Sequence, residues 1–256
     1  MAKTNQNGKR KMGAGSKIIL LVALVVLAFS TYKLVSIYLE YKRGVDEYNK
    51  VGDLAMLQLD FGEPPFDIDF EALKEQNQDV IGWIYFPNLP INYPIMHSDS
   101  NNYYLKHTFE KEYNFAGSIF LEALNSPDFT DDNTLVYGHN MKNESMFGSL
   151  KRYKEKVVFD ENSYFYIFTP EHGPRKYKIF SYYITRKTDS YVLSFENEDA
   201  KGKYLLDVLD KSMFDLQVPV ERADELVMLV TCTSRVDDER FVFHAKLDKN
   251  WKWEKH

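Results

Sequence analysis

The chain has 256 residues, of which 44% are hydrophobic and 27% charged, a balance that excludes an intrinsically disordered protein. Its one cysteine excludes an intrachain disulfide and any metal site built from several cysteines. The formal net charge is −6 although the first residues are basic, so the rest of the chain is acidic, which argues against nucleic acid as a partner.

The N-terminal segment has the pattern of a membrane anchor. Residues 1–17 carry five basic residues and no acid, and the run that follows has no charge until Lys33. A lysine ammonium can reach the headgroup layer, so the predicted transmembrane span is 18–38. We expect an uncleaved signal anchor, because no small-residue cleavage site follows the run, and a cleaved signal peptide is the alternative. The positive-inside rule places 1–17 in the cytoplasm and makes this a single-pass cell-membrane protein with its body outside the cell.

Three further segments follow the anchor. Apolar residues spaced by three predict a helical stalk or a helix packed on the domain within 39–68, and the prolines at 64 and 65 stop it. A globular domain is predicted over 69–250, opened by a short helix at 69–77, and 251–256 is a C-terminal tail.

The globular domain is predicted to be mainly β. Short runs rich in β-branched and aromatic residues are separated by turn signals, with few helices between them. Eight such strands predict a closed eight-stranded β-barrel with a few flanking helices, because closure leaves no exposed sheet edge. The predicted strands are 80–86, 91–96, 117–121, 134–137, 163–168, 175–184, 226–232 and 240–247, and the predicted helices within the barrel sequence are 146–153 and 198–213.

The single thiol, Cys232, ends one of the predicted strands. A thiol attacks only as the thiolate, so a nucleophilic cysteine needs a base or a cation beside it. A lone cysteine is more often a small buried hydrophobic residue, and the residues around it therefore decide between the two interpretations.

Two other residues could supply that chemistry. His139 follows an apolar strand and Gly138, and the ends of strands are where a rigid scaffold displays catalytic groups. Arg240 opens the last strand, and its fixed fork of donors could stabilise an oxyanion or hold a substrate backbone. The alternatives are a structural turn for His139 and a surface ion pair with a neighbouring acid, at 237–239, for Arg240. No metal-binding or nucleotide-binding motif is present, so no cofactor is expected.

Taken together, these residues resemble the sortases, the membrane-anchored cysteine transpeptidases of Gram-positive bacteria. The resemblance rests on Thr231-Cys232 after an apolar strand, on Arg240 before an alternating strand, and on Tyr137-Gly-His139. Further similarity lies at 77–84, 91–94, 101–105 and 117–120. The run from Tyr137 to Met141, and a helix before the last two strands, are most similar to class B.

The resemblance implies a sortase-type barrel with a catalytic set and a peptide groove. Its implied catalytic residues are His139, Cys232 and Arg240. It also implies that Asn101 and Leu105 line the substrate groove, with Tyr137 and Tyr191 as candidates for the same groove. Two departures concern the peptide contacts: residue 230 is valine where this class often has serine, and the loop 233–239 is short.

The function implied is that of a class B-like sortase. Such an enzyme cleaves a secreted protein at a C-terminal sorting motif, after a threonine, through a thioacyl enzyme. It then transfers the protein to a peptidoglycan precursor amine. The expected partners are these substrates, the acceptor amine and the membrane, with no nucleic acid. Two alternatives stay open: a membrane-tethered, non-catalytic binding protein on a sortase-like barrel, and a hydrolytic cysteine peptidase.

Overall fold

The computed structural model describes residues 13–59, 63–186, 191–232 and 239–253. The predicted basic N-terminus, the C-terminal tail and the loop after Cys232 lie wholly or partly outside these ranges, and Cys232 is described by its backbone. The chain divides into two compact units, Met1–Arg43 and Gly44–His256.

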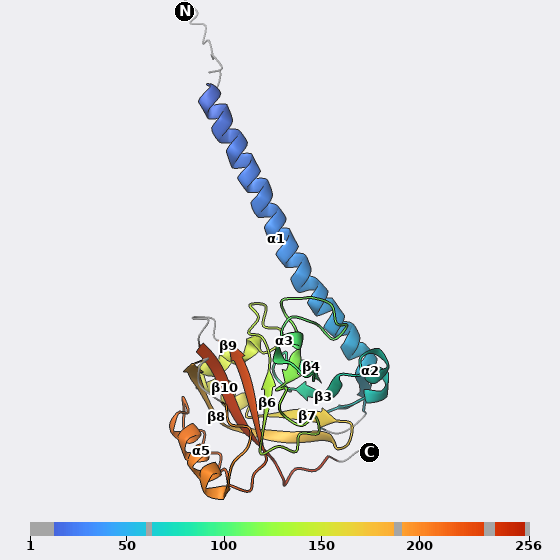
Figure 1. Cartoon of the computed structure of the whole chain (residues 1–256), viewed down its shortest axis with the longest axis vertical. Helices are drawn as coiled ribbons and strands as arrows, with labels where there is room; N and C mark the ends of the chain where they lie inside the picture. Colours follow the sequence, from blue (N-terminus) through green and yellow to red (C-terminus); the bar gives the residue numbers. More distant parts are fainter. Residues whose placement is uncertain (1–12, 60–62, 187–190, 233–238, 254–256) are drawn as a thin grey trace, which may run out of the picture. The chain divides into compact units, whose positions relative to one another are not determined.

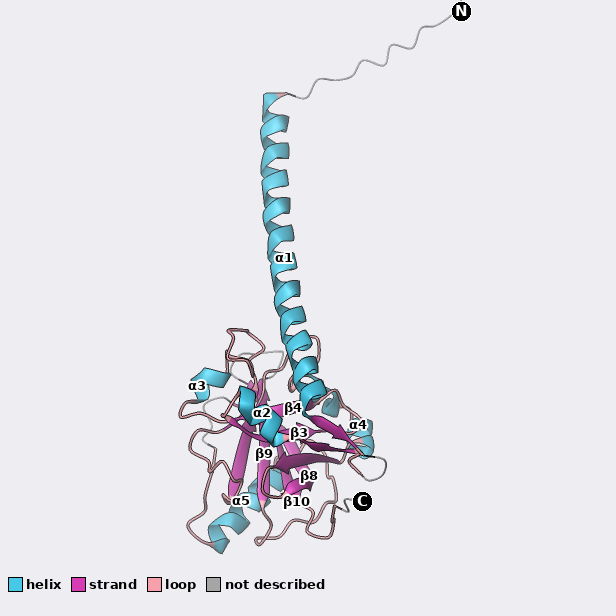
Figure 2. Cartoon of the chain, turned by 90° about the vertical axis from the view of Figure 1, so that its right-hand side faces the viewer, coloured by secondary structure: helices cyan, strands magenta, loops and turns pink. Residues whose placement is uncertain are grey.

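The first unit consists of the N-terminal part of the long helix α1, Ala14–Ala55. Its apolar side chains are exposed; Ile19, for example, is 71% exposed. Among the described helices, α1 is the one that is long and apolar enough to cross a membrane (Figure 2). The predicted span 18–38 would be about 32 Å long at 1.5 Å per residue, which matches the thickness of the hydrocarbon core of a bilayer.

The second unit begins with the last turns of α1, which are packed rather than solvated. Tyr48 is buried, and its hydroxyl donates to the carbonyl of Gly117 at 2.8 Å. Glu47 accepts from the backbone N–H of Glu110 at 2.9 Å. The helix ends at Ala55, because the chain then forms a two-stranded ribbon of β1 (Met56–Gln58) and β2 (Phe66–Ile68). Of the two possibilities for 39–68, a helix packed on the domain therefore describes residues 44–55, and the helix ends before the prolines at 64 and 65, which the sequence predicts to stop it.

Eight strands form a closed barrel in the order β10-β8-β7-β3-β4-β5-β6-β9, and β9 pairs with β10 to close it. The pairs β4–β5 and β6–β9 are parallel and the others antiparallel. The strands are β3 Val80–Tyr85, β4 Asn92–Met96, β5 Ile119–Leu121, β6 Asn133–Tyr137, β7 Tyr164–Thr169, β8 Gly173–Arg186, β9 Leu226–Cys232 and β10 Glu239–Leu247. All eight fall where the sequence predicts strands, and the closed barrel is confirmed.

Short helices connect the strands. Figure 1 shows α5 beside β8 on the outside of the barrel, where Leu205 and Val208 pack against Phe180 and Val242. Full burial of each such side chain stabilises the fold by about 1.5–3 kcal/mol. The helices are α2 Phe70–Gln76, α3 Asn101–Tyr104, the 3-10 helix η1 Gly148–Lys154, α4 Lys156–Glu161 and α5 Glu198–Asp210.

Side-chain caps explain where two of these helices begin. Asp69 accepts from the N–H of Ala72, and Asn197 accepts from the N–H of Ala200, each at 2.9 Å. Such caps satisfy backbone donors that have no partner inside the helix. The helix predicted at 146–153 is in fact the tighter η1, followed by the separate short helix α4.

Candidate active site

Strand register brings the three predicted catalytic residues to one end of the barrel. Cys232, the last residue of β9, is paired with Arg240 on β10. The parallel pairing of β6 with β9 sets Tyr137 opposite Val230, and the N–H of Gly138 donates to the carbonyl of Val230 at 3.2 Å. His139 therefore follows β6 beside the end of β9.

A pocket of about 250 Å³ opens at this end. Six of the seven predicted site residues line it, and the seventh, Cys232, directly follows the lining residue Thr231. The six are Asn101, Leu105, Tyr137, His139, Tyr191 and Arg240. Residues that are up to 139 positions apart in the chain thus meet around one cavity.

The imidazole of His139 is held by a backbone carbonyl. Its Nε2 lies 2.7 Å from the carbonyl oxygen of Leu105. A carbonyl oxygen can only accept, so Nε2 carries the hydrogen and Nδ1 is the nitrogen left for proton transfer. Gly138 is needed before it, because a Cβ there would lie 2.4 Å from Ile119 and 2.7 Å from Phe147.

Arg240 contributes the positive charge of the pocket. It is half-buried, and its Nη1 donates to the carbonyl of Glu239 at 2.9 Å. The guanidinium is charged at every physiological pH and presents several donors in one plane. This group can therefore stabilise negative charge on an oxygen inside the pocket.

Glu122, which the sequence analysis did not single out, lies behind the groove. Its Oε1 accepts from Nδ2 of Asn101 and its Oε2 from the hydroxyl of Tyr137, each at 2.7 Å. Burial, and then the bond to this carboxylate, raise the pKa of Tyr137, which therefore stays a neutral phenol. The available signal was its position directly after a strand, two residues beyond the motif at 117–120.

Thr231 is one of the residues that line the pocket. The residue is 3% exposed, and its Oγ1 has no hydrogen-bond partner among the described residues. Buried hydroxyl groups are usually paired, so this buried and unpaired hydroxyl next to Cys232 is an exception.

Two other histidines have structural surroundings. His244 is fully buried, with Nε2 3.2 Å from the hydroxyl of Tyr183 and Nδ1 3.4 Å from that of Tyr204. Burial lowers the pKa of His244 to about 3, so it is neutral. His107 stacks on Tyr103, with ring centroids 4.4 Å apart. His244 is the satisfied strand histidine that its alternating position suggests, and neither residue lines the pocket of His139.

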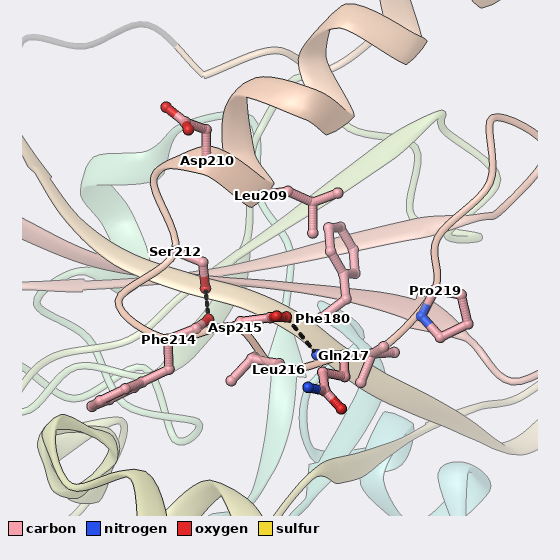
Figure 3. Close-up of a pocket in the computed structure, with 10 residues that line it drawn as sticks. Phe180, Leu209, Asp210, Ser212, Phe214, Asp215, Leu216, Gln217 and Pro219 are labelled. Atoms are coloured by element: carbon pink, nitrogen blue, oxygen red, sulfur yellow. Dashed lines mark hydrogen bonds between the residues drawn. The ribbon is translucent and has the colours of Figure 1, made fainter.

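A second hollow, of about 590 Å³, lies where the chain leaves α5 (Figure 3). Its wall is mostly apolar, and the residues drawn in Figure 3 include no histidine, cysteine, lysine or arginine. Ser212 donates to the carbonyl of Phe214 at 2.9 Å, and the N–H of Gln217 donates to Asp215 at 3.0 Å. The hydroxyl of Ser212 and the carboxylate of Asp215 are thus bonded within their own loop. In the part of the chain that the structure describes, no cluster of three or more metal-ligating side chains is found.

The closed barrel and the pocket at the end of β6, β9 and β10 define a β-barrel protein with a candidate thiol-transfer site. A family model described as the Sortase domain matches residues 84–248. The chain belongs to the sortase family.

Named relatives agree with this assignment. Sortase B of Listeria monocytogenes is 36% identical over 185 residues, which are 70% of this chain and 74% of the relative. Sortase B of Staphylococcus aureus is 28% identical over 235 residues, 91% of this chain and 96% of the relative. The crystal structure of sortase B from B. anthracis in complex with AAEK1 superposes with a TM-score of 0.73 at 30% identity, covering 82% of this chain and 98% of that one. The chain is therefore a sortase-type transpeptidase.

Proposed function

We propose that this sortase is class B-like and that it joins secreted proteins to a peptidoglycan precursor amine after cleaving a C-terminal sorting motif behind a threonine. The observation that supports the proposal is that Cys232 is paired with Arg240 across β9 and β10, while Arg240 and His139 both line one pocket. Nothing in the comparisons favours a non-catalytic binding protein or a hydrolytic peptidase.

In the first half of the reaction, the thiolate of Cys232 attacks the threonine carbonyl. The developing oxyanion is stabilised by the guanidinium of Arg240. His139, as the imidazolium, donates the proton on Nδ1 to the departing amine while Nε2 stays bonded to Leu105. The carbon–nitrogen bond breaks, and the substrate's acyl group remains on sulfur as a thioester.

In the second half, an acceptor amine attacks the thioester. The neutral Nδ1 of His139 takes the proton of the incoming amine, the carbon–sulfur bond breaks, and the thiolate returns. Every proton released in one half is thus consumed in the other. The reaction needs no redox partner.

The groove residues support a peptide substrate. Asn101, Leu105, Tyr137 and Tyr191 line the same pocket as His139 and Arg240. Tyr137 and Tyr191 contact each other, with ring centroids 6.4 Å apart. Val230 also lines the pocket and makes part of its wall apolar where class B members often have serine.

The apolar N-terminal helix supports a membrane anchor that would hold this chemistry at the outer face of the membrane. The exposed apolar part of α1 is long enough to span, and the five basic residues before Ile18 favour a cytoplasmic N-terminus. The domain from Gly44 onward would then stand outside the cell, where secreted substrates and cell-wall precursors meet.

The test uses the full chain in detergent and a library of peptides carrying sorting-type motifs. We expect cleavage behind threonine, and in the presence of a short amine nucleophile a product in which the amine has replaced the leaving peptide, detected by mass spectrometry. Cys232→Ala should lose the activity and keep the melting temperature of the wild type. Equal turnover by Cys232→Ala would refute the thiol mechanism. A hydrolysed product alone, with no amine-containing product at every amine concentration tested, would favour the peptidase.

A further inference from the structure

We propose that Glu122 is a positioning residue of the peptide groove, which orients Asn101 and Tyr137 so that they present one donor and one acceptor to an amide group of the substrate. This inference rests on the proposed function. Glu122 is not one of the residues that line the pocket, whereas Asn101 and Tyr137 both are.

The carboxylate holds both groove residues at once. Its two oxygens accept from Nδ2 of Asn101 and from the hydroxyl of Tyr137, each at 2.7 Å. Hydrogen bonds to a charged acceptor are short and about twice as strong as neutral ones. Each groove residue is thus bonded to a different oxygen of one rigid group.

The amide of Asn101 can adopt one orientation only. Its Oδ1 accepts from the N–H of Ala123 at 2.8 Å while its Nδ2 donates to Glu122. A flipped amide would face its oxygen toward the carboxylate and its NH₂ toward an N–H, losing both bonds. One of the two hydrogens on Nδ2 is used by Glu122, so the second is left to donate to a carbonyl.

The hydroxyl of Tyr137 is oriented in the same way. A carboxylate has no hydrogen to donate, so the hydroxyl hydrogen must lie on the bond to Glu122. The phenol oxygen then keeps its lone pairs for an N–H of a ligand. A fixed donor beside a fixed acceptor complements a peptide or carboxamide group, which has one carbonyl and one N–H to satisfy.

Glu122 is itself held by the barrel. Its N–H donates to the carbonyl of Leu135 at 2.9 Å, directly after the pairing of Leu121 with Val136. A site residue supported by strand hydrogen bonds is placed more precisely than one on a free loop. The carboxylate is therefore a firm support for two residues that come from α3 and β6.

The experiment measures KM and kcat of the full chain in detergent, with a peptide that the wild type cleaves. Glu122→Gln keeps the shape of the side chain but offers an NH₂ where one acceptor was needed. We expect its KM, and that of Glu122→Ala, to rise about tenfold. We expect kcat, and the rate at which a methanethiosulfonate reagent alkylates Cys232, to stay within about twofold, because only substrate binding is affected.

Two comparisons separate positioning from a general effect. Glu122→Asp keeps both acceptor oxygens and should recover part of the wild-type KM. Glu171→Gln removes the same charge at an exposed position in the β7–β8 turn and should behave as the wild type. In a double variant of Glu122→Ala with Tyr137→Phe, the rise in KM should be smaller than the product of the two single effects, since both changes remove the bond between Glu122 and the Tyr137 hydroxyl.

An unchanged KM in Glu122→Gln and Glu122→Ala, with cleavage intact, would overturn the positioning role and leave the proposed function standing. A fall in kcat together with slower alkylation would also overturn it, because Glu122 would then act on the thiol. Absence of cleavage by the wild type would instead refute the proposed function. Melting temperatures are measured for every variant, and Glu122→Gln, which has the shape of the native side chain, decides the matter if Glu122→Ala does not fold.

Discussion

The Nε2 atom of His139 lies 2.7 Å from the carbonyl oxygen of Leu105, a residue 34 positions earlier in the chain. This bond determines which imidazole nitrogen can exchange protons with a substrate. The carbonyl is positioned by the close approach of Gly117, which is in the left-handed region at φ 55°. The N–H of Ser118, the next residue, donates to the carbonyl of Tyr104 at 2.9 Å.

Gly117→Ala should impair both folding and turnover. An added Cβ would lie 2.6 Å from the carbonyl oxygen of Tyr104 and 2.7 Å from that of Leu105, in a backbone conformation that alanine disfavours. We expect a loss of about 1–3 kcal/mol in the free energy of unfolding. We also expect kcat to fall at least about tenfold, because a displaced Leu105 carbonyl no longer orients the imidazole.

Gly202→Ala is the matched control, because the nearest atoms that an added Cβ meets in α5 belong to the side chain of Arg222, which can move away. Alanine there should leave activity unchanged and the helix as stable or more stable. Urea unfolding and peptide cleavage are measured for both variants. Wild-type turnover in Gly117→Ala would show that the bond from His139 to Leu105 does not matter for catalysis.

His244 should make the domain less stable in mild acid. Burial lowers its pKa in the folded protein to about 3, whereas the ordinary value is 6.5. Between these values the unfolded chain binds a proton that the folded chain does not, so this contribution to stability is complete above pH 6.5 and is lost as the pH falls toward 3. The slope is up to about 1.4 kcal/mol per pH unit.

The measurement is urea unfolding between pH 4 and 7.5 for the wild type and for His244→Gln. The variant removes the titrating group and should show a flatter pH dependence of stability over that interval. Parallel curves for the two proteins would mean that His244 is not held neutral. The control is His107→Gln, which removes a histidine that is half-buried and stacked on Tyr103.

The last turns of α1 should be needed for full stability of the domain. Tyr48, Val51 and Ala55 are buried in the unit that begins at Gly44. A fragment that starts at residue 60 loses their burial, worth about 1.5–3 kcal/mol for a large side chain. We expect it to melt at least about 10 °C below a fragment that starts at residue 44.

Tyr48→Phe in the longer fragment isolates one contribution to that difference. It removes only the hydroxyl that donates to Gly117 and should lower stability by about 1 kcal/mol. Equal melting temperatures for the two fragments would show that the end of α1 does not support the barrel.

The orientation of the anchor can be tested by labelling. In a Cys232→Ala background, Lys3→Cys gives a single thiol at the N-terminus. A membrane-impermeant maleimide should not label it in intact cells and should label it after permeabilisation, because the basic residues favour the cytoplasmic side. A cysteine at Lys154, within the globular domain, should be labelled in both cases, and the reverse pattern would contradict the proposed topology.

Much of this protein could be predicted from local sequence patterns. Short runs rich in β-branched and aromatic residues, separated by turn signals, predict the eight barrel strands, because such side chains pack well on a pleated sheet. The apolar run after five basic residues predicts the membrane anchor, because a helix of about 20 apolar residues matches the hydrocarbon core of a bilayer. Cys232, His139 and Arg240 could be selected because each stands at the end of a predicted strand beside recognisable neighbours.

The role of Glu122 could be decided only by the tertiary structure. The residue has no motif of its own, and its partners Asn101 and Tyr137 lie 21 and 15 positions away. The partner of His139 could likewise be found only in the tertiary structure. Every residue has a backbone carbonyl, and the sequence does not show that the carbonyl of Leu105 is the one that contacts His139. The periodicity of a sequence reports which side of an element is buried, whereas hydrogen bonds between distant segments depend on the register of the closed barrel.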